Sequence, residues 1–405
     1  MNIAFKYPKA TGQLAVPQYP SDLTRVARVE VFDTIEAAEP IWRRLEDGGA
    51  LFTSYQCIEL LAAWQHHVGT KAGITPFIVT GFDAQGEPLF VWPFGRAQKG
   101  PFKILRFLGS KHSNFNMGLW RRDSLSSIRE DEIRAVLAGL SGEADAVGLC
   151  NQPLTWDGAA NPFALLPRQP AADMSARQSL LPHSRDPAIN QILSTSMRSR
   201  LRNKERKLQR LPGYRYVHAR DDAEIDRLLD SFFNLKASHM AAQGLDNVFA
   251  DPGVPEFLRS ACHHKLPNGR RLIEIHALEV TGEVLALFGT IVDHYRCSSM
   301  FNTYTLGENA RYSPGLILLV HMINEISARG VQTFDIGVGR AHYKSFFCRE
   351  PEPLFDTFIG LTPRGQMLAL FFSVAFSMKR LIKHNRALWA VVGLMRRLRA
   401  QLILP

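Results

Sequence analysis

The chain has 405 residues, of which 46% are hydrophobic and 21% charged, and its formal net charge is +10. This length favours two domains of ordinary size, and the composition excludes a largely disordered or low-complexity chain. The basic excess favours anionic partners such as nucleotides, nucleic acids or lipid headgroups, without choosing among them.

The first 26 residues lack the uninterrupted apolar core of a secretory signal, and we expect them to form a loose lead-in. The five cysteines are far apart and include no CxxC pair, which indicates reduced thiols in a cytoplasmic protein. Residues 27–166 then predict a mixed α/β domain. Its expected elements are a strand at 27–35, helices at 36–48 and 54–69, a hairpin at 74–97, a helix at 127–142 and a strand at 144–150.

Residues 167–189 are rich in Pro, Ser and Arg, a composition typical of a linker between domains. Residues 190–362 then repeat the element order of the first half, which suggests a duplicated α/β unit. Its expected elements are a strand at 214–221, helices at 222–243 and 254–265, three strands within 270–305, a helix at 314–328, a strand at 332–338, a helical turn at 340–347 and a strand at 354–362. This order of strands and helices is that of the GNAT fold.

The segment before the helix at 314–328 is the most informative motif. Ser313 suits the N-cap and Pro314 the first helical position, and Gly315 has no side chain to obstruct a ligand. The first turn of such a helix leaves backbone N–H groups unpaired at its positive end, which suits a phosphate, and Arg311 could add a charged contact. The alternative interpretation is that Ser-Pro-Gly only caps the helix.

The sequence resembles the CelD/BcsL-like acyltransferases, a bacterial GNAT branch related to the Fem-type transferases that carry two GNAT-like units. The resemblance covers residues 28–362. The strict GNAT phosphate loop, Q/R-x-x-G-x-G/A, is absent, since Arg311–Leu316 offers only its arginine and a glycine. The resemblance rests on four motifs, Leu105–Ser110, Ser199–Leu208, Tyr312–Leu316 and Phe334–Phe347.

This resemblance implies acetyl-CoA or a longer acyl-CoA as co-substrate. In GNAT-like chemistry an amine attacks a thioester, so the site needs a proton acceptor and a proton donor for the departing thiolate. Asp335 or His342 could accept the proton, and Tyr343 could donate one. The alternatives are that Asp335 caps a turn and Tyr343 packs in the core. The coenzyme is expected at Arg311, Tyr312, Ser313, Gly315 and Leu316.

Lys344 and Arg202 are the residues expected to bind an anionic acceptor. Arg202 lies in Ser196–Leu211, a basic segment with apolar residues near helical spacing. A solvated helix face and a lining for a phosphorylated or lipid-linked acceptor are equally simple interpretations of this segment, and the resemblance favours the lining. Lys344 could likewise be solvated. Nucleic-acid binding is disfavoured, because no aromatic residues interleave with the cations.

Residues 363–405 predict a basic, amphipathic helical tail, with no acidic residue after Asp356. The apolar run Met367–Met378 is shorter than the roughly 20 residues that a spanning helix needs. Packing on the protein body is one interpretation of the tail. Peripheral attachment at the inner membrane is the other.

We therefore expect tandem GNAT-like units with a helical tail, forming an acyl-CoA-dependent N-acyltransferase. The acceptor amine, or alternatively hydroxyl, would belong to a sugar-containing or cell-envelope precursor, either a small molecule or lipid-linked, as in polysaccharide biosynthesis. The alternative function is a non-catalytic binding module of an exopolysaccharide assembly system. No metal is expected, because HExxH and cysteine clusters are absent and the pairs His66-His67 and His263-His264 diverge on a helix.

Overall fold

The computed structural model describes residues 13–14, 25–182, 184, 186–339, 341–385 and 387–388. Most of the predicted lead-in and the end of the predicted tail lie outside these residues. The chain divides into two compact units. The first comprises Met1–Ala172 and Pro353–Leu381, and the second comprises Asp173–Glu352 and Ile382–Pro405.

The first unit is built on a sheet with the strand order β1-β2-β3-β4-β5-β7-β18-β10, and β6 pairs with β4. Neighbouring strands are antiparallel except β5 and β7, which are parallel. Its strands are β1 Gln13–Leu14, β2 Arg28–Phe32, β3 Ile74–Phe82, β4 Pro88–Lys99, β5 Phe102–Phe107, β6 Leu119–Trp120, β7 Ala146–Pro153, β10 Gln169–Pro170 and β18 Leu354–Gly360, and a separate ribbon joins β8 Thr155–Trp156 to β9 Ala159–Ala160.

The helices of the first unit follow the predicted periodicity. Thr34 caps α1 by accepting a hydrogen bond from the Ala37 amide, and the helix buries Trp42 and Leu45 on one face. The predicted helix at 54–69 is divided into a 3-10 turn, an α-helix and a π-helical turn. The helices are α1 Ile35–Asp47, α2 Ile58–Trp64, α3 Glu130–Gly139 and α10 Pro363–His384, of which Ile382–His384 belong to the second unit.

The second unit has a seven-stranded sheet in the order β12-β13-β14-β15-β16-β11-β17. The predicted helix Pro314–Ala328 is confirmed with the same bounds, and the three strands predicted within 270–305 are confirmed as well. The strands are β11 Ser175–Ser179, β12 Arg215–His218, β13 Glu274–Val280, β14 Glu283–Val292, β15 Arg296–Tyr304, β16 Thr333–Asp335 and β17 Glu350–Glu352.

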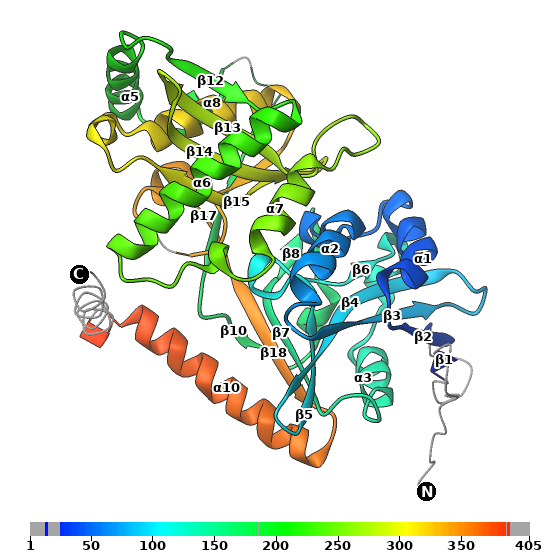
Figure 1. Cartoon of the computed structure of the whole chain (residues 1–405). Coiled ribbons are helices and arrows are strands. Elements are labelled where there is room, and N and C mark those ends of the chain that lie inside the picture. The colour runs from blue at the N-terminus through cyan, green and yellow to red at the C-terminus, as the bar shows by residue number, and fades with distance from the viewer. Residues whose placement is uncertain are drawn as a thin grey trace, which may run out of the picture. The chain divides into compact units, whose positions relative to one another are not determined.

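Two helices of the second unit cover opposite faces of this sheet (Figure 1). On one face, Phe232 of α6 contacts Phe301 of β15 at a ring-centroid distance of 4.7 Å. On the other face, α8 buries its apolar side chains in a cluster that includes Phe288 of β14. The helices of this unit are α4 Ala188–Ile192, α5 Thr195–Leu208, α6 Asp222–Ala242, α7 Val254–His263, α8 Pro314–Ala328 and α9 Lys344–Phe347.

The unit boundaries differ from those predicted. The presumed linker 167–189 contributes β10 to the first sheet and β11 to the second. The strand expected to end the second domain, β18, instead pairs with β7 of the first sheet. Each sheet thus includes a strand from a distant part of the chain, β18 between β7 and β10 in the first and β11 between β16 and β17 in the second. A composition scan along the sequence does not reveal such an exchange.

The parallel strands β15 and β16 separate early, and this separation positions the site. Their pairing covers only Arg296–Ser298 of β15, opposite Thr333–Asp335 of β16. A bulge also interrupts the pairing of β15 with β14 between Gly289 and Thr290. Among the strands that the structure describes, the end of β15, Asn302–Tyr304, therefore pairs with β14 alone, and its other edge is open to form a site.

Candidate active site

A cavity of about 220 Å³ lies in the second unit at the open end of β15. Its wall comes from five parts of the chain: β14, the last residues of β15, the 3-10 turn Glu308–Tyr312, the start of α8 and the segment after β16. The lining residues are Phe288, Asn302, Thr303, Tyr304, Ala310, Ser313, Pro314, Gly315, Leu316 and Tyr343.

The start of α8 forms one wall of the cavity and has an unusual backbone at its N-cap. Ser313 adopts φ 57° and ψ 52°, the left-handed region that a non-glycine residue seldom occupies. In this conformation its hydroxyl makes no capping bond to the helix, and it instead accepts a 2.7 Å hydrogen bond from Nζ of Lys204 on α5. Pro314 has no N–H and the Leu316 amide donates to the Ser313 carbonyl at 3.0 Å, so the positive end of α8 offers the Gly315 amide beside this lysine cation.

Gly315 leaves open space in front of this helix start. A Cβ atom added there would meet only the Cβ of Tyr304, at 3.9 Å, which is an ordinary contact distance. Its backbone does not require a glycine by conformation, since its φ is not in the left-handed region. The space before the backbone, together with the Lys204 ammonium, suits an anionic group such as a phosphate.

Three of the five residues predicted to hold the coenzyme, Ser313, Gly315 and Leu316, line the cavity. Arg311 does not line it. Its exposed side chain pairs with Glu308 at 2.9 Å and lies over the Tyr312 ring, and Tyr312 packs against the core cluster. The charge that the sequence assigned to Arg311 is supplied instead by Lys204, because α5 packs beside the 3-10 turn Glu308–Tyr312.

Tyr343, which the sequence suggested as a proton donor, lies in the cavity wall. Its hydroxyl oxygen accepts a hydrogen bond of 3.5 Å from Nδ2 of Asn302. Burial raises the pKa of Tyr343 to about 12, so its phenol stays protonated at neutral pH. A neutral phenol at this position can donate a proton to a leaving group in the cavity.

Asp335 does not reach the cavity, which corrects its predicted role as a proton acceptor. Its side chain is fully buried, and Oδ2 accepts hydrogen bonds of 2.6 Å from both Nε of Arg296 and Oγ of Ser298. Oδ1 accepts a 2.7 Å hydrogen bond from the Gly337 amide. Arg296 also forms two hydrogen bonds with Glu352, so Asp335 belongs to a buried ionic network that joins β15, β16 and β17.

His342, Lys344 and Arg202 also lie outside the cavity wall. His342 is exposed and contacts the Phe346 ring, while Arg202 is exposed on α5. Nζ of Lys344 donates to the carbonyl oxygens of Gly337 and Val338 at 3.1 and 3.2 Å. Lys344 therefore holds the loop after β16, which corrects its predicted contact with an acceptor.

Lys236 and His239 of α6 approach the same end of β15 from the other face, and the sequence did not single them out. Nζ of Lys236 donates to the Asn302 carbonyl at 3.1 Å, and burial beside Lys344 lowers the pKa of Lys236 to about 8. Nδ1 of His239 lies 3.2 Å from Oγ1 of Thr303, and burial lowers the pKa of His239. The sequence signal that could have identified them is their spacing, because Lys236 and His239 follow Phe232 at i+4 and i+7 and so lie on the buried face of α6. Polar side chains on a buried face need partners there.

A buried polar cluster lies elsewhere in the second unit, between the sheet and α8. His218, Glu274 and His276 place one potential metal-ligand atom each within 4.8 Å of one another, although the sequence has no metal motif. Both oxygens of Glu274 accept hydrogen bonds from Arg329, at 2.6 and 2.8 Å. Burial lowers the pKa of His276 to about 3, so the ring is neutral. The guanidinium already compensates the Glu274 charge, and we interpret the cluster as a structural link between β13 and α8.

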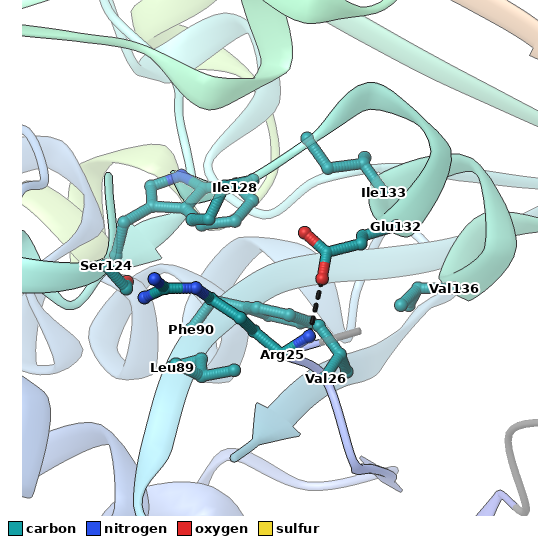
Figure 2. Close-up of a pocket in the computed structure, with 10 residues that line it drawn as sticks. Arg25, Val26, Leu89, Phe90, Ser124, Ile128, Glu132, Ile133 and Val136 are labelled. Carbon is teal, nitrogen blue, oxygen red and sulfur yellow. Dashed lines mark hydrogen bonds between the residues drawn. The ribbon is translucent and has the colours of Figure 1, made fainter. Parts of the chain in front are cut away.

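A hollow in the first unit is much smaller than the cavity beside α8. It lies between the segment at Arg25, β4 and α3, and its volume of about 10 Å³ is close to that of one water-sized probe (Figure 2). The Arg25 amide donates a 2.7 Å hydrogen bond to Oε1 of Glu132 across it. This size excludes a coenzyme from the hollow as it stands.

Comparisons with known proteins agree with this geometry. Residues 195–345 match the family model described as an acetyltransferase (GNAT) domain, and these residues include Lys204, the start of α8 and Tyr343. No curated protein matches the chain.

Solved structures show a similar fold at low sequence identity. FemX is 10% identical, with 84% of this chain and 100% of FemX covered at a TM-score of 0.54. The C-terminal domain of a putative lysylphosphatidylglycerol synthetase from Agrobacterium fabrum is 12% identical, with 83% and 96% covered and a TM-score of 0.49. A tandem GNAT protein from the clavulanic acid pathway is 11% identical, with 83% and 99% covered and a TM-score of 0.46. Residues 195–345 of the second unit therefore match a GNAT acetyltransferase domain, and the chain as a whole is similar in fold to FemX.

Proposed function

We propose that the second unit binds an acyl-CoA at the start of α8 and transfers the acyl group to an acceptor amine. The observation that carries this proposal is the meeting of the α8 N-terminus, the Lys204 ammonium and Tyr343 around one cavity. The coenzyme phosphates would lie against the Gly315 amide at the positive end of α8 and against Lys204. The thioester would then extend along the open edge of β15 toward Tyr343.

The reaction requires two proton transfers. The acceptor nitrogen attacks the thioester carbonyl and loses a proton, the C–N bond forms, and the C–S bond breaks. Tyr343 would protonate the departing thiolate, because its phenol is neutral at the pH of the reaction. Lys236 does not line the cavity, so we assign it to accept the amine proton through one intervening water, since a lysine with a pKa of about 8 is partly neutral in mildly alkaline solution.

We further propose that the chain belongs to the CelD/BcsL-like branch and that its acceptor is a sugar-containing or cell-envelope precursor. The four motifs named above support this branch. The other exposed cations of α5, among them Arg202 and Arg206, support an acceptor that carries phosphate. Acylation of a hydroxyl is the second form of the same reaction, because the cavity does not by itself select nitrogen over oxygen.

An acyl-transfer assay tests this function. The full chain would be incubated with acetyl-CoA and longer acyl-CoAs, together with amino sugars and lipid-linked sugar phosphates, and release of the CoA thiol would be measured. Mass spectrometry of the acceptors would identify an amide or ester product. We expect acceptor-dependent thiol release with at least one pair. Binding of a sugar precursor without any acyl-CoA binding would instead favour the non-catalytic module.

A further inference from the structure

Helix α10 presents a continuous apolar stripe to solvent on the first unit. Six large side chains of the helix, spaced three or four residues apart or adjacent, are between 51% and 70% exposed. A stripe of this length is unusual for a surface helix, because isolated exposed apolar residues are normal but contiguous ones mark an interaction site. The residues are Met367, Leu370, Phe371, Val374, Met378 and Leu381.

The opposite face of α10 is fixed to the first unit (Figure 1). Phe358 of β18 contacts the rings of Phe372 and Phe376, with centroids 6.0 and 5.0 Å apart. At the start of the helix Nε of Arg364 pairs with Asp145 at 2.6 Å. Gly365 lies so close to Asp145 that an added Cβ would overlap the carbonyl oxygen. The helix is therefore docked along one side and bare along the other.

This two-sided arrangement decides how α10 can meet a membrane. By length and composition it is the one helix among the described residues that could cross a bilayer, and 11% of its most apolar window is buried. A spanning helix, however, is surrounded on all sides by lipid or by other membrane-embedded segments, whose backbone polar groups must all be hydrogen-bonded within the protein. The docked face of α10 instead lies on a sheet that belongs to a folded unit. The helix can thus lie in the plane of the interface with its apolar stripe immersed.

The charge of this part of the chain selects the kind of surface. After Asp356 the sequence has no acidic residue. On α10 itself Lys379 and Arg380 are exposed beside the apolar stripe, whereas Lys383 pairs with Asp173. Cations next to an immersed apolar stripe favour anionic lipid headgroups. The later basic residues are Arg386, Arg396, Arg397 and Arg399.

We propose that the stripe Met367–Leu381 is a docking surface for an anionic lipid bilayer, with α10 lying in the interface. This inference does not depend on acyl transfer, because no residue of α10 lines the cavity. It assigns the chain to the membrane surface, where a lipid-linked acceptor would also be found.

Vesicle sedimentation tests the proposal with the full chain. The probes are vesicles of phosphatidylcholine alone and of phosphatidylcholine with phosphatidylglycerol. We expect binding to the mixed vesicles, weaker binding at high salt, and little binding to pure phosphatidylcholine. Replacing Leu370 and Phe371 together with serine should weaken binding roughly tenfold or more, because two large apolar side chains no longer enter the interface.

The matched control is Leu165→Ser, which removes an exposed leucine of the same unit outside the stripe. The control should bind to vesicles like the wild type. The melting temperatures of the control and of the double variant should match that of the wild type, because Leu165, Leu370 and Phe371 are all exposed. Equal vesicle binding by the double variant would overturn the proposal. So would a wild-type dimer in analytical ultracentrifugation that the double variant abolishes, since a second copy would then cover the stripe. Resistance of membrane-bound protein to alkaline carbonate extraction would indicate a spanning helix and would equally overturn it.

Discussion

Nζ of Lys204 donates a 2.7 Å hydrogen bond to Oγ of Ser313, although 109 residues separate them along the chain. This bond brings a cation from the basic helix α5 to the first turn of α8. It also accounts for the Ser313 hydroxyl, which does not cap its own helix. The pair defines the end of the cavity at which we place the coenzyme phosphates.

Lys204→Met should weaken acyl-CoA binding without unfolding the protein. Loss of one charge-assisted hydrogen bond costs about 1.5 to 3 kcal/mol, which corresponds to a tenfold or greater fall in affinity. Titration calorimetry measures this change. The matched control is Lys207→Met, because Lys207 is exposed on the same helix. An equal loss in both variants would mean that only the general charge of α5 matters.

Tyr343→Phe and His342→Ala should separate the two neighbouring residues that the sequence placed in one site. Removing the Tyr343 hydroxyl should lower kcat on the order of 100-fold with little change in acyl-CoA affinity, because a general acid acts in the transition state. His342→Ala should leave kcat within about twofold of the wild type, since the side chain is exposed outside the cavity. Steady-state kinetics on both variants measures these changes. If His342 were the catalytic group, His342→Ala would show the larger fall in kcat.

The pH profile should report Lys236. Its pKa of about 8 lies below that of an ordinary lysine, so the neutral form that accepts a proton becomes dominant as the pH rises through 8. We expect kcat/KM of the wild type to rise with pH to a plateau above this value. Lys236→Met should lower the plateau and abolish this rise. A variant that keeps the same rising limb would assign the titration to another group.

Asp335→Asn should affect stability more than chemistry. The substitution leaves Arg296 with one fewer anionic partner in a buried network, and breaking such a pair costs about 3 to 5 kcal/mol. We expect the melting temperature to fall by roughly 10 °C. The remaining folded protein should keep the pH profile of the wild type. A selective loss of the rising limb in a variant of unchanged melting temperature would restore Asp335 as the proton acceptor.

The sequence was most informative where local rules decide the structure. Pro314 and the apolar period after it determine where α8 begins and how far it extends, and the turn at Thr281-Gly282 determines a strand boundary. The role of Asp335 could not be predicted, because its partner Arg296 lies 39 residues away on a parallel strand. The Lys204 contact was hidden for the same reason, since α5 offers several cations and only the packing of α5 beside α8 selects one.

Titration of the full chain with acetyl-CoA and longer acyl-CoAs, alongside Gly315→Val, tests the central claim most directly. Valine at this position would place a branched side chain between the α8 backbone and the phosphates, while the surrounding space accommodates its Cβ. The account predicts saturable acyl-CoA binding by the wild type and a tenfold or greater loss of affinity in the variant, with a melting temperature that changes little. No binding of any acyl-CoA by the wild type, or equal affinity in a folded Gly315→Val protein, would contradict it.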